Sequence, residues 1–361
     1  MSQHAVSTLA SDLPRWRAGE DDTLECVQVC DETHDVKTFV FRACPERRFG
    51  YLPGQFLTLE LEIGGQTVHR CYTLSSAPTR PGRVAITVKR VPGGQVSNWL
   101  HDTLRPGMRL AVLGPAGDFS CAARPPAPYL FLSAGSGITP LMSMSRSLGD
   151  LGGPFDLVFL HSARSPRDLI FQLELQALAR SHPGFRLQYL CESRDGDAAW
   201  PGALGRLNAV LLAMLVPDLD RRQVYCCGPA PYMASVRAAL AELDFDMGGY
   251  HEESFDFSAS PAAPEASAVG VSAGGGFRLD FALSHKNAHA APGQTVLAAA
   301  ADHGMRIPSS CSRGVCGTCK SRLTQGRVDM KHGGGIRQRE IDQGYFLPCC
   351  STPLTDLVIE R

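Results

Sequence analysis

The chain has 361 residues, a formal net charge of −1, a hydrophobic share of 44% and a charged share of 20%. At roughly one domain per 100 to 200 residues, this length predicts two or three domains of ordinary globular composition. The near-neutral charge argues against nucleic acid and anionic membranes as partners. The longest apolar runs, such as 209–216, are shorter than the roughly 18 residues of a spanning helix.

The first segment, residues 1–20, is small and polar and has neither a basic n-region nor an apolar h-region. We therefore expect a disordered leader rather than a secretory signal, and a protein of the cytoplasm. A reducing compartment keeps thiols free, so metal or redox chemistry explains a cluster among the thirteen cysteines better than disulfides do.

Residues 21–123 read as short β-rich runs, such as 38–41 and 56–61, separated by Pro-Gly and Gly-Gly turns. Several such strands in succession predict an antiparallel β-barrel. One run reads Arg-Cys-Tyr-Thr-Leu-Ser over residues 70–75, and Gly-Gly-Gln-Val-Ser over residues 93–97 begins a plausible helix. Taken alone the first motif is weak, because arginine and tyrosine on a strand are usually half-buried surface residues.

Residues 124–257 change character. Compact apolar runs at 129–132, 156–160, 185–190 and 223–226 alternate with helical patterns at 167–180 and 231–243. This alternation predicts an α/β domain with a parallel sheet. The turn Gly135-Ser136-Gly137 follows the first strand, where glycine lets backbone amides approach a pyrophosphate at a helix N-terminus. Pro140 replaces the last glycine of the dinucleotide fingerprint, which weakens that motif when it is taken alone.

Residues 258–276 are almost wholly Ser, Ala, Pro and Gly, a composition that predicts a flexible linker. The last segment, 277–361, carries the dense cysteine group Cys311, Cys316, Cys319 and Cys349. Its C-x4-C-x2-C…C spacing is typical of plant-type [2Fe-2S] ligation, and Gly314 and Gly317 would supply tight turns with positive φ. A zinc site, which usually uses paired C-x2-C knuckles, and thiols without metal are the alternatives.

This last segment resembles a plant-type ferredoxin over its whole length, which implies an α+β, β-grasp domain. The ferredoxin family places its last ligand four positions before a proline. The resemblance therefore selects Cys349, four positions before Pro353, although Cys350 is the competing ligand.

The first two segments resemble the ferredoxin–NADP reductase superfamily, through the R-x-Y-T and G-x-x-S motifs, Gly-Ser-Gly-Ile-Thr-Pro at 135–140, Cys-Gly-Pro at 227–229 and Glu-Ser-Phe at 253–255. The resemblance implies that Arg70 binds the flavin pyrophosphate, Tyr72 stacks on the isoalloxazine and Thr73 lies near flavin N5. A second phosphate-binding element at 94–97 favours FAD over FMN.

The resemblance assigns two sets of residues. Those implied to bind cofactor are Arg70, Tyr72, Thr73, Ser75, Lys89, Gly94, Gln95, Val96, Ser97, Gly135, Gly137, Thr139, Pro140, Cys227, Gly228, Pro229 and Phe255. Those implied to act in hydride transfer are Tyr72, Thr73, Cys227 and Glu253.

Several alternatives stay open in the nucleotide segment. Cys227 aligns with the family cysteine, and Cys226 reads as a buried strand residue. Simple packing explains Glu253 and Phe255 as well as a site role does. We expect NADH from the resemblance, with NADPH as the alternative, because Arg164 after the second strand would meet either a 2′-phosphate or solvent.

The chain after the leader resembles the reductase component of two-component Rieske-type oxygenases, and its tail at 329–341 resembles reductases that serve demethylases of quaternary amines such as glycine betaine. This resemblance implies an enzyme that passes electrons from NADH through FAD and a [2Fe-2S] cluster to an oxygenase. The NADH oxidoreductase of a hybrid-cluster protein and a non-catalytic redox-sensing module are the alternatives.

The expected linker would let the ferredoxin domain swing between flavin and partner.

Six basic residues gather in the ferredoxin segment: Arg313, Lys320, Arg322, Lys331, Arg337 and Arg339. A solvated face is the simpler interpretation of this group, and a docking surface is the alternative.

Overall fold

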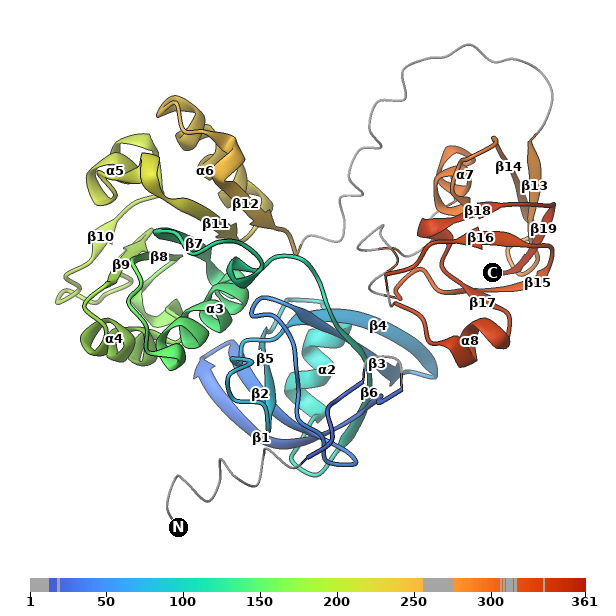
Figure 1. The fold of residues 1–361 in the computed structure, drawn as a ribbon, viewed down its shortest axis with the longest axis horizontal. Helices are drawn as coiled ribbons and strands as arrows, with labels where there is room; N and C mark the ends of the chain where they lie inside the picture. Colours follow the sequence, from blue (N-terminus) through green and yellow to red (C-terminus); the bar gives the residue numbers. More distant parts are fainter. Residues whose placement is uncertain are drawn as a thin grey trace.

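The computed structural model describes residues 13–17, 20–255, 276–305, 307, 309, 314, 317–333 and 335–361. Three domains follow one another along the chain, and the first lies between the other two (Figure 1). The predicted order of barrel, parallel α/β domain and ferredoxin-like domain is confirmed. The expected linker, apart from Gly276, lies outside the described residues.

The first domain is an antiparallel barrel whose sheet has the order β4-β3-β6-β1-β2-β5. The strands are β1 (Thr23–Thr33), β2 (Val36–Ala43), β3 (Phe56–Ile63), β4 (Gln66–Thr73), β5 (Val84–Lys89) and β6 (Arg109–Ala116). A bridge between Leu74 and Ile86 joins the two edges of the sheet. Helix α2 (Gln95–Thr103) buries Val96 and Leu100 in the barrel core. Closure leaves few unpaired strand edges.

The predicted disordered leader, residues 1–20, includes a segment that packs on the barrel. Trp16 is 5% exposed, lies 5.2 Å from the Phe49 ring between centroids, and donates a hydrogen bond from Nε1 to the Gly114 carbonyl (2.9 Å). Burial of a large aromatic ring with its N–H satisfied anchors this segment. The described residues of the leader, 13–17, therefore contact the barrel instead of forming a free tail.

The second domain is a parallel sheet of order β10-β9-β8-β7-β11-β12. Its strands are β7 (Tyr129–Ala134), β8 (Leu157–Ala163), β9 (Phe185–Cys191), β10 (Ala203–Leu204), β11 (Gln223–Cys227) and β12 (Tyr250–Glu253). Helices α3 (Ile138–Leu151) and α4 (Gln172–Ser181) pack on one face, and α5 (Ala209–Leu215) and α6 (Ala230–Glu242) pack on the other. Strands buried on both faces explain the near-continuous apolar runs.

The helix was predicted to begin at residue 167, but the observed helix begins five residues later. A 3-10 turn at Pro166–Asp168 comes first, and Phe171 then adopts a left-handed backbone with φ 57°. Leu169, Ile170 and Phe171 are all at most 5% exposed. Their burial beneath the sheet overrides the helical pattern, so α4 begins only at Gln172.

The third domain has a five-stranded sheet of order β14-β13-β19-β15-β17 and a two-stranded sheet, β16-β18. The strands are β13 (Phe277–Phe281), β14 (Lys286–Ala290), β15 (Ser321–Gln325), β16 (Val328–Met330), β17 (Tyr345–Phe346), β18 (Ser351–Pro353) and β19 (Leu357–Glu360). Helix α7 (Val296–Asp302) packs its buried side on this core, and α8 (Gln338–Asp342) lies toward the barrel (Figure 1). This is the predicted α+β domain.

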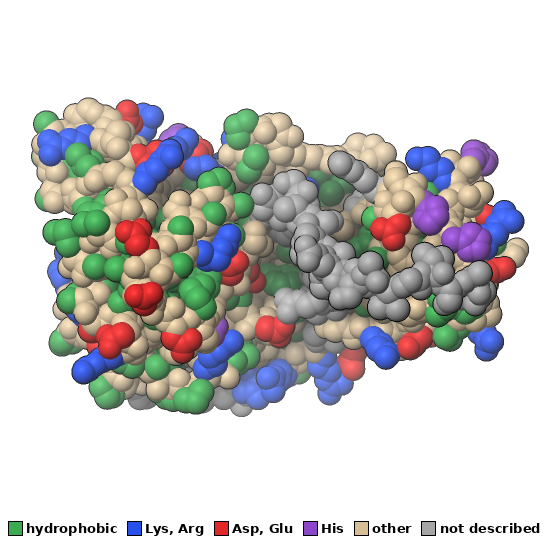
Figure 2. Space-filling model, turned by 90° about the horizontal axis from the view of Figure 1, so that it is seen from above, with side chains coloured by type: hydrophobic (Ala, Val, Ile, Leu, Met, Phe, Trp, Pro, Cys, Tyr) green, Lys and Arg blue, Asp and Glu red, His purple; other side chains and the backbone are tan. Residues whose placement is uncertain are grey.

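Acidic and basic side chains are interspersed over the face seen in Figure 2, with no large region of one sign. Among the residues that the structure describes, no helix is long and apolar enough to cross a membrane.

Candidate functional site

A cavity of about 1130 Å³ opens between the barrel and the parallel α/β domain. Most of the residues that the resemblance assigned to FAD and nucleotide binding meet there, from β4, β5, the start of α2, the start of α3 and the end of β12. These are Arg70, Tyr72, Thr73, Lys89, Gly94, Gln95, Val96, Ser97, Thr139, Glu253 and Phe255. Its position between two domains is typical of cofactor sites.

The barrel wall of this cavity is formed by β4 and β5. Thr73 is 6% exposed, and burial raises the pKa of the neighbouring Tyr72, so its phenol stays protonated. The Lys89 ammonium lies 3.1 Å from the Asp35 carboxylate. This wall therefore presents an aromatic ring, neutral hydroxyls and a cation that is already paired.

The start of α2 forms a closed turn at the cavity. The Ser97 hydroxyl accepts a hydrogen bond from the Val91 N–H (3.2 Å) and donates one to the Gly94 carbonyl (3.3 Å). A Cβ built on Gly94 would lie 2.6 Å from Ser97 Oγ, so a side chain at this position would displace the hydroxyl from its hydrogen bonds. All four residues of this helix start, 94–97, line the cavity, and the N–H groups of a helix start are able to bind phosphate.

Ser75 lies elsewhere. It is fully buried, it does not line the cavity, and its hydroxyl lies 2.9 Å from Thr87 Oγ1 and 3.3 Å from the Ala85 carbonyl. The structure therefore gives this predicted cofactor residue a place in the hydrogen-bonded wall of the barrel.

Two loops meet at the carboxyl ends of the adjacent strands β7 and β11. A Cβ on Gly137 would lie 2.2 Å from the Cys227 carbonyl oxygen, whereas Gly135, with φ +53°, has open space around it. Gly228 lies beside Ala134 in the same way. Pro140 lies in the first turn of α3 and Pro229 directly before α6. The strand order of this sheet reverses between β7 and β11, and ligands of α/β sheets bind at such a reversal.

The two neighbouring cysteines of β11 face opposite sides of the sheet. Cys227 packs with the α3 side and Cys226 with the α5 and α6 side. Burial raises the pKa of Cys227 well above its ordinary value and that of Cys226 to about 12. Both thiols are therefore neutral, which restricts Cys227 to packing and contact rather than ionic chemistry.

The cavity also has lining residues outside the predicted set, among them Phe119, Arg124, Ser136, Arg237 and His251. The His251 ring lies 4.8 Å from the Tyr225 ring between centroids, and its Nε2 lies 2.9 Å from Gln223 Oε1. These residues come from separate segments, so only Ser136, inside the glycine turn, carried a signal in the sequence.

The donor set suits a flavin dinucleotide. Arg70 and the helix start at Gly94 line the cavity, as phosphate binding requires, and Tyr72 and Phe255 present aromatic surface in the same cavity. The cavity volume of about 1130 Å³ is also large enough for a dinucleotide.

The predicted cluster ligands lie in the third domain. Cys319 is 1% and Cys349 7% exposed, and both belong to one buried core. Gly314 and Gly317 have φ of +68° and +71°, as predicted for the ligand loop. The Cys350 thiol is half-buried and contacts the Leu347 carbonyl at 3.6 Å. Cys311 and Cys316 lie outside the described residues.

Family models match each domain in turn. Residues 24–121 match an oxidoreductase FAD-binding domain, residues 131–238 an oxidoreductase NAD-binding domain, and residues 283–354 a 2Fe-2S iron-sulfur cluster binding domain. These matches confirm the predicted cofactors.

Curated relatives align over nearly the whole chain. A glycine betaine monooxygenase reductase subunit of Pseudomonas aeruginosa is 45% identical over 349 residues, covering 93% of this chain and 94% of the relative. A stachydrine N-demethylase reductase subunit of Rhizobium meliloti is 42% identical over 339 residues, covering 94% and 96%. Phthalate dioxygenase reductase shares the fold, with a TM-score of 0.58 at 23% identity over 94% of this chain and 97% of that one.

The predicted oxidoreductase activity and module order are thus confirmed. The chain belongs to the family of oxygenase reductase subunits that join FAD-binding, NAD-binding and [2Fe-2S] domains in one polypeptide.

Proposed function

We propose that this protein supplies electrons from NADH to a Rieske-type terminal oxygenase that demethylates a quaternary amine of the glycine betaine class. The observation that carries the proposal is the 45% identity, over 93% of the chain, to a reductase subunit named for glycine betaine monooxygenase. The relative named for stachydrine demethylation, at 42% identity, supports the same substrate class.

The residues of the cavity would hold FAD and the nicotinamide. Arg70 and the amides of residues 94–97 would bind the pyrophosphate, Tyr72 would cover the ring and Thr73 would orient it. When bound, FAD supplies the change from two-electron hydride chemistry to one-electron chemistry that a [2Fe-2S] cluster requires. The Tyr72 phenol and the Cys227 thiol are both neutral and would add no charge of their own beside the bound ring.

The preference for NADH is part of the proposal, and the contacts of Arg164 support it. Its guanidinium lies 2.5 Å from the Asp168 carboxylate and 3.5 Å from that of Asp35. An arginine that is already compensated by two carboxylates offers less attraction to a 2′-phosphate. NADPH would then gain little from this side chain.

The cluster assignment also remains a proposal: Cys311, Cys316, Cys319 and Cys349 would ligate the [2Fe-2S] group. The deep burial of Cys319 and Cys349 in one core supports this set, and the greater exposure of Cys350 disfavours that thiol.

Reconstitution tests the function. The purified holoenzyme is mixed with NADH and the oxygenase component of a glycine betaine monooxygenase, and formaldehyde is measured with glycine betaine or stachydrine present. We expect formaldehyde and NADH oxidation in equal amounts. The control omits the oxygenase. Rapid NADH-driven reduction of cytochrome c without any formaldehyde would reject the oxygenase partner while leaving the electron path intact.

A further inference from the structure

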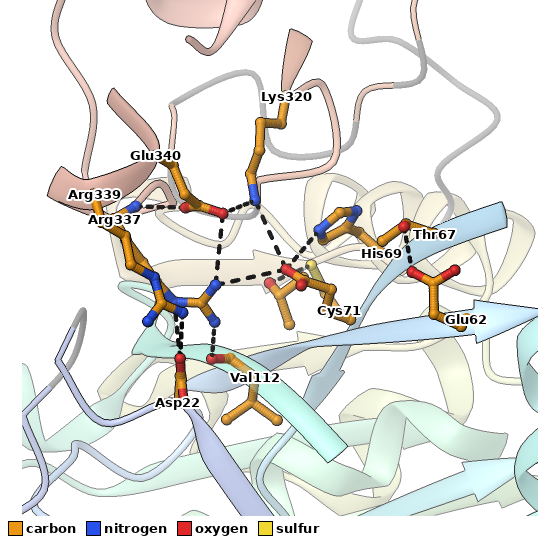
Figure 3. A network of polar contacts seen from close by, with 12 residues as sticks. Asp22, Glu62, Thr67, His69, Cys71, Val112, Lys320, Arg337, Arg339 and Glu340 are labelled. Carbon is orange, nitrogen blue, oxygen red and sulfur yellow. Dashed lines mark hydrogen bonds and ion pairs between the residues drawn. The ribbon is translucent and has the colours of Figure 1, made fainter. Parts of the chain in front are cut away.

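The ferredoxin domain contacts the barrel through a network of charges (Figure 3). Lys320, Arg337 and Arg339 come from the ferredoxin domain, and Asp22 and Glu60 come from the barrel. Half of the basic group expected to be a solvated face is therefore engaged within the molecule. Arg322 and Lys331 pair with exposed acids of their own domain, and Arg313 lies outside the described residues.

Arg337 is the most buried of these cations, with a side chain 3% exposed. Its Nη2 donates a hydrogen bond to the Val112 carbonyl on β6 (2.8 Å). Its Nη1 lies 3.7 Å from Glu60 Oε2 on β3 and 3.5 Å from Glu340 Oε1. The guanidinium therefore reaches out of the ferredoxin domain and meets both a backbone acceptor and a carboxylate of the barrel.

Glu340 holds the two buried cations in place. One of its oxygens accepts a hydrogen bond from the Arg337 backbone N–H (2.8 Å), and the other lies 2.6 Å from the Lys320 ammonium. Lys320, 10% exposed, directly follows Cys319 and lies 3.7 Å from Glu60. The network thus connects a predicted cluster ligand to the barrel through one side chain.

Glu60 is charged at neutral pH. The hydrogen bond with His69 (3.1 Å), and then the charges of Lys320 and Arg337, lower the pKa of this carboxyl to about 2. Glu60, 26% exposed, lies between two cations of the other domain. Lys320 and Arg337 share Glu340 within their own domain, so docking adds a second carboxylate to these two cations and two cations to Glu60.

This attachment lies beside the electron path. Gly317, between two predicted cluster ligands, approaches β6 so closely that a Cβ there would lie 3.0 Å from Leu113 Cδ1. Thr318 and Lys320 share a cleft of about 600 Å³ with His69 and Arg70 of β4. Arg70 also lines the large cavity, so one barrel residue borders both the flavin site and the cluster segment.

We propose that Arg337, with Lys320 and Glu60, positions the ferredoxin domain on the barrel in the arrangement in which electrons pass from the flavin site to the cluster. The two electrons of one NADH leave the barrel singly, and the second follows after the acceptor has reoxidised the cluster. The proposal rests on the electron path of the family and is independent of the oxygenase substrate. The Arg337 face is then closed to external partners while the domains are docked.

Stopped-flow mixing of the holoenzyme with NADH tests the proposal. Arg337→Ala and, on the other domain, Glu60→Gln should slow bleaching of the cluster by about tenfold or more, since one partner of the charge pair that joins the two domains is lost. Bleaching of the flavin should keep the wild-type rate. The matched control is Arg322→Ala, because Arg322 is 52% exposed and pairs with Glu360 of its own domain.

Two further readouts separate positioning from damage to the cluster. Small-angle X-ray scattering should show a larger radius of gyration for Arg337→Ala than for the wild type and for Arg322→Ala. Raising the salt from about 0.05 M to about 0.5 M should slow cluster reduction in the wild type and have little further effect in the variants.

Wild-type cluster reduction in both Arg337→Ala and Glu60→Gln would overturn the proposal. Slow cluster reduction with unchanged scattering and unchanged salt dependence would also overturn it, since Arg337 would then act on the cluster rather than on docking. If Arg337→Ala fails to fold, Glu60→Gln carries the test from the barrel side.

Discussion

The barrel meets its two neighbours through chemically different surfaces. Toward the parallel α/β domain, Val36 and Phe119 join the same buried core as Leu141 and Phe131. Hydrogen bonds reinforce this contact: Arg146 donates to the Ser75 carbonyl (2.5 Å) and Ser143 to the Ser76 carbonyl (2.6 Å). Shared apolar core with satisfied backbone acceptors is typical of a permanent interface.

Toward the ferredoxin domain, the interface is mainly ionic. Among the described residues, Lys320, Arg337 and Arg339 contact Asp22, Glu60 and the Val112 carbonyl, and the close approach of Gly317 to Leu113 supplies apolar contact. The two acids of this interface, Asp22 and Glu60, are 23% and 26% exposed, and Arg339 is 60% exposed. Interactions that involve such partly exposed charges weaken with salt, whereas apolar burial does not. The second interface is therefore the better suited to opening.

This difference follows from the two transfers. Hydride transfer requires the donor and acceptor atoms to be held close to their reactive geometry, and a fixed interface provides this. Outward electron transfer requires the cluster to meet the flavin site and then another protein, which a reversible interface permits. Variants of either interface, and a change of pH, should therefore affect one transfer and spare the other.

Replacing the last predicted cluster ligand should remove the cluster and leave flavin reduction intact. Cys349→Ser should abolish the brown [2Fe-2S] absorption, because a hydroxyl is a poor replacement for the thiolate that holds the cluster. NADH should still bleach the flavin at the wild-type rate. Visible spectra before and after anaerobic NADH addition measure both. Cys350→Ser is the control, and loss of the cluster there instead would assign Cys350 as the ligand.

A methyl group at Gly137 should destabilise the parallel α/β domain. Because its Cβ would lie 2.2 Å from the Cys227 carbonyl oxygen, Gly137→Ala forces the two nucleotide loops apart. We expect about 3 kcal/mol of destabilisation, which lowers the melting temperature of this domain by roughly 10 °C, and weaker NADH binding. Gly135→Ala, with φ +53° and open space, should cost about 1 kcal/mol. Equal melting temperatures for both variants would show that the loops can separate freely.

Acid should weaken the α/β domain before it weakens the ionic interface. His161 is fully buried, its Nδ1 lies 2.8 Å from Ser133 Oγ, and burial lowers its pKa from 6.5 to about 3. The unfolded chain therefore binds the proton that the folded chain excludes. Stability falls as the pH drops below 6.5, by about 2 kcal/mol between pH 7 and pH 5.

Glu60 behaves differently. Its pKa falls from 4.5 to about 2, so its contribution is complete above pH 4.5 and is lost only as the pH approaches 2. Calorimetric melting at pH 7, 6 and 5 measures the contrast. His161→Asn should flatten the pH dependence of the α/β domain, and an unchanged slope in this variant would remove His161 as its cause.

Sequence reasoning predicted the parts of the fold that depend on local pattern. The apolar runs of the parallel sheet and the alternating runs of the barrel are continuous in the chain, so their periodicity is visible. The anchoring of Trp16 was missed because its acceptor, the Gly114 carbonyl, is far away in sequence. The start of α4 was missed because the left-handed Phe171 is imposed by burial and has no local signature.

The candidate site divides in the same way. Arg70, Tyr72 and the glycine turns stand in compact motifs, and the structure brings them to one cavity. Arg124 and His251 reach that cavity only through the domain arrangement, which no spacing reveals. The pairing of Arg337 with Glu60 likewise joins two distant segments, and for this reason the basic group of the ferredoxin domain was expected to be solvated.

The smallest expected effect concerns nucleotide choice at the edge of the fixed interface. Asp168→Asn keeps a hydrogen bond with Ser165 Oγ (2.7 Å) but removes the charge beside Arg164. The Arg164 guanidinium, then paired with Asp35 alone, should favour a 2′-phosphate, so kcat/KM for NADPH should rise by about two- to fivefold, the value of one ion pair at the surface. Steady-state rates with both nucleotides measure this ratio. Adding Arg164→Ala should cancel the gain, because the attraction resides in that side chain. A gain that persists without Arg164 would place 2′-phosphate recognition in another part of the domain, and the contacts of Arg164 would then say nothing about NADH preference.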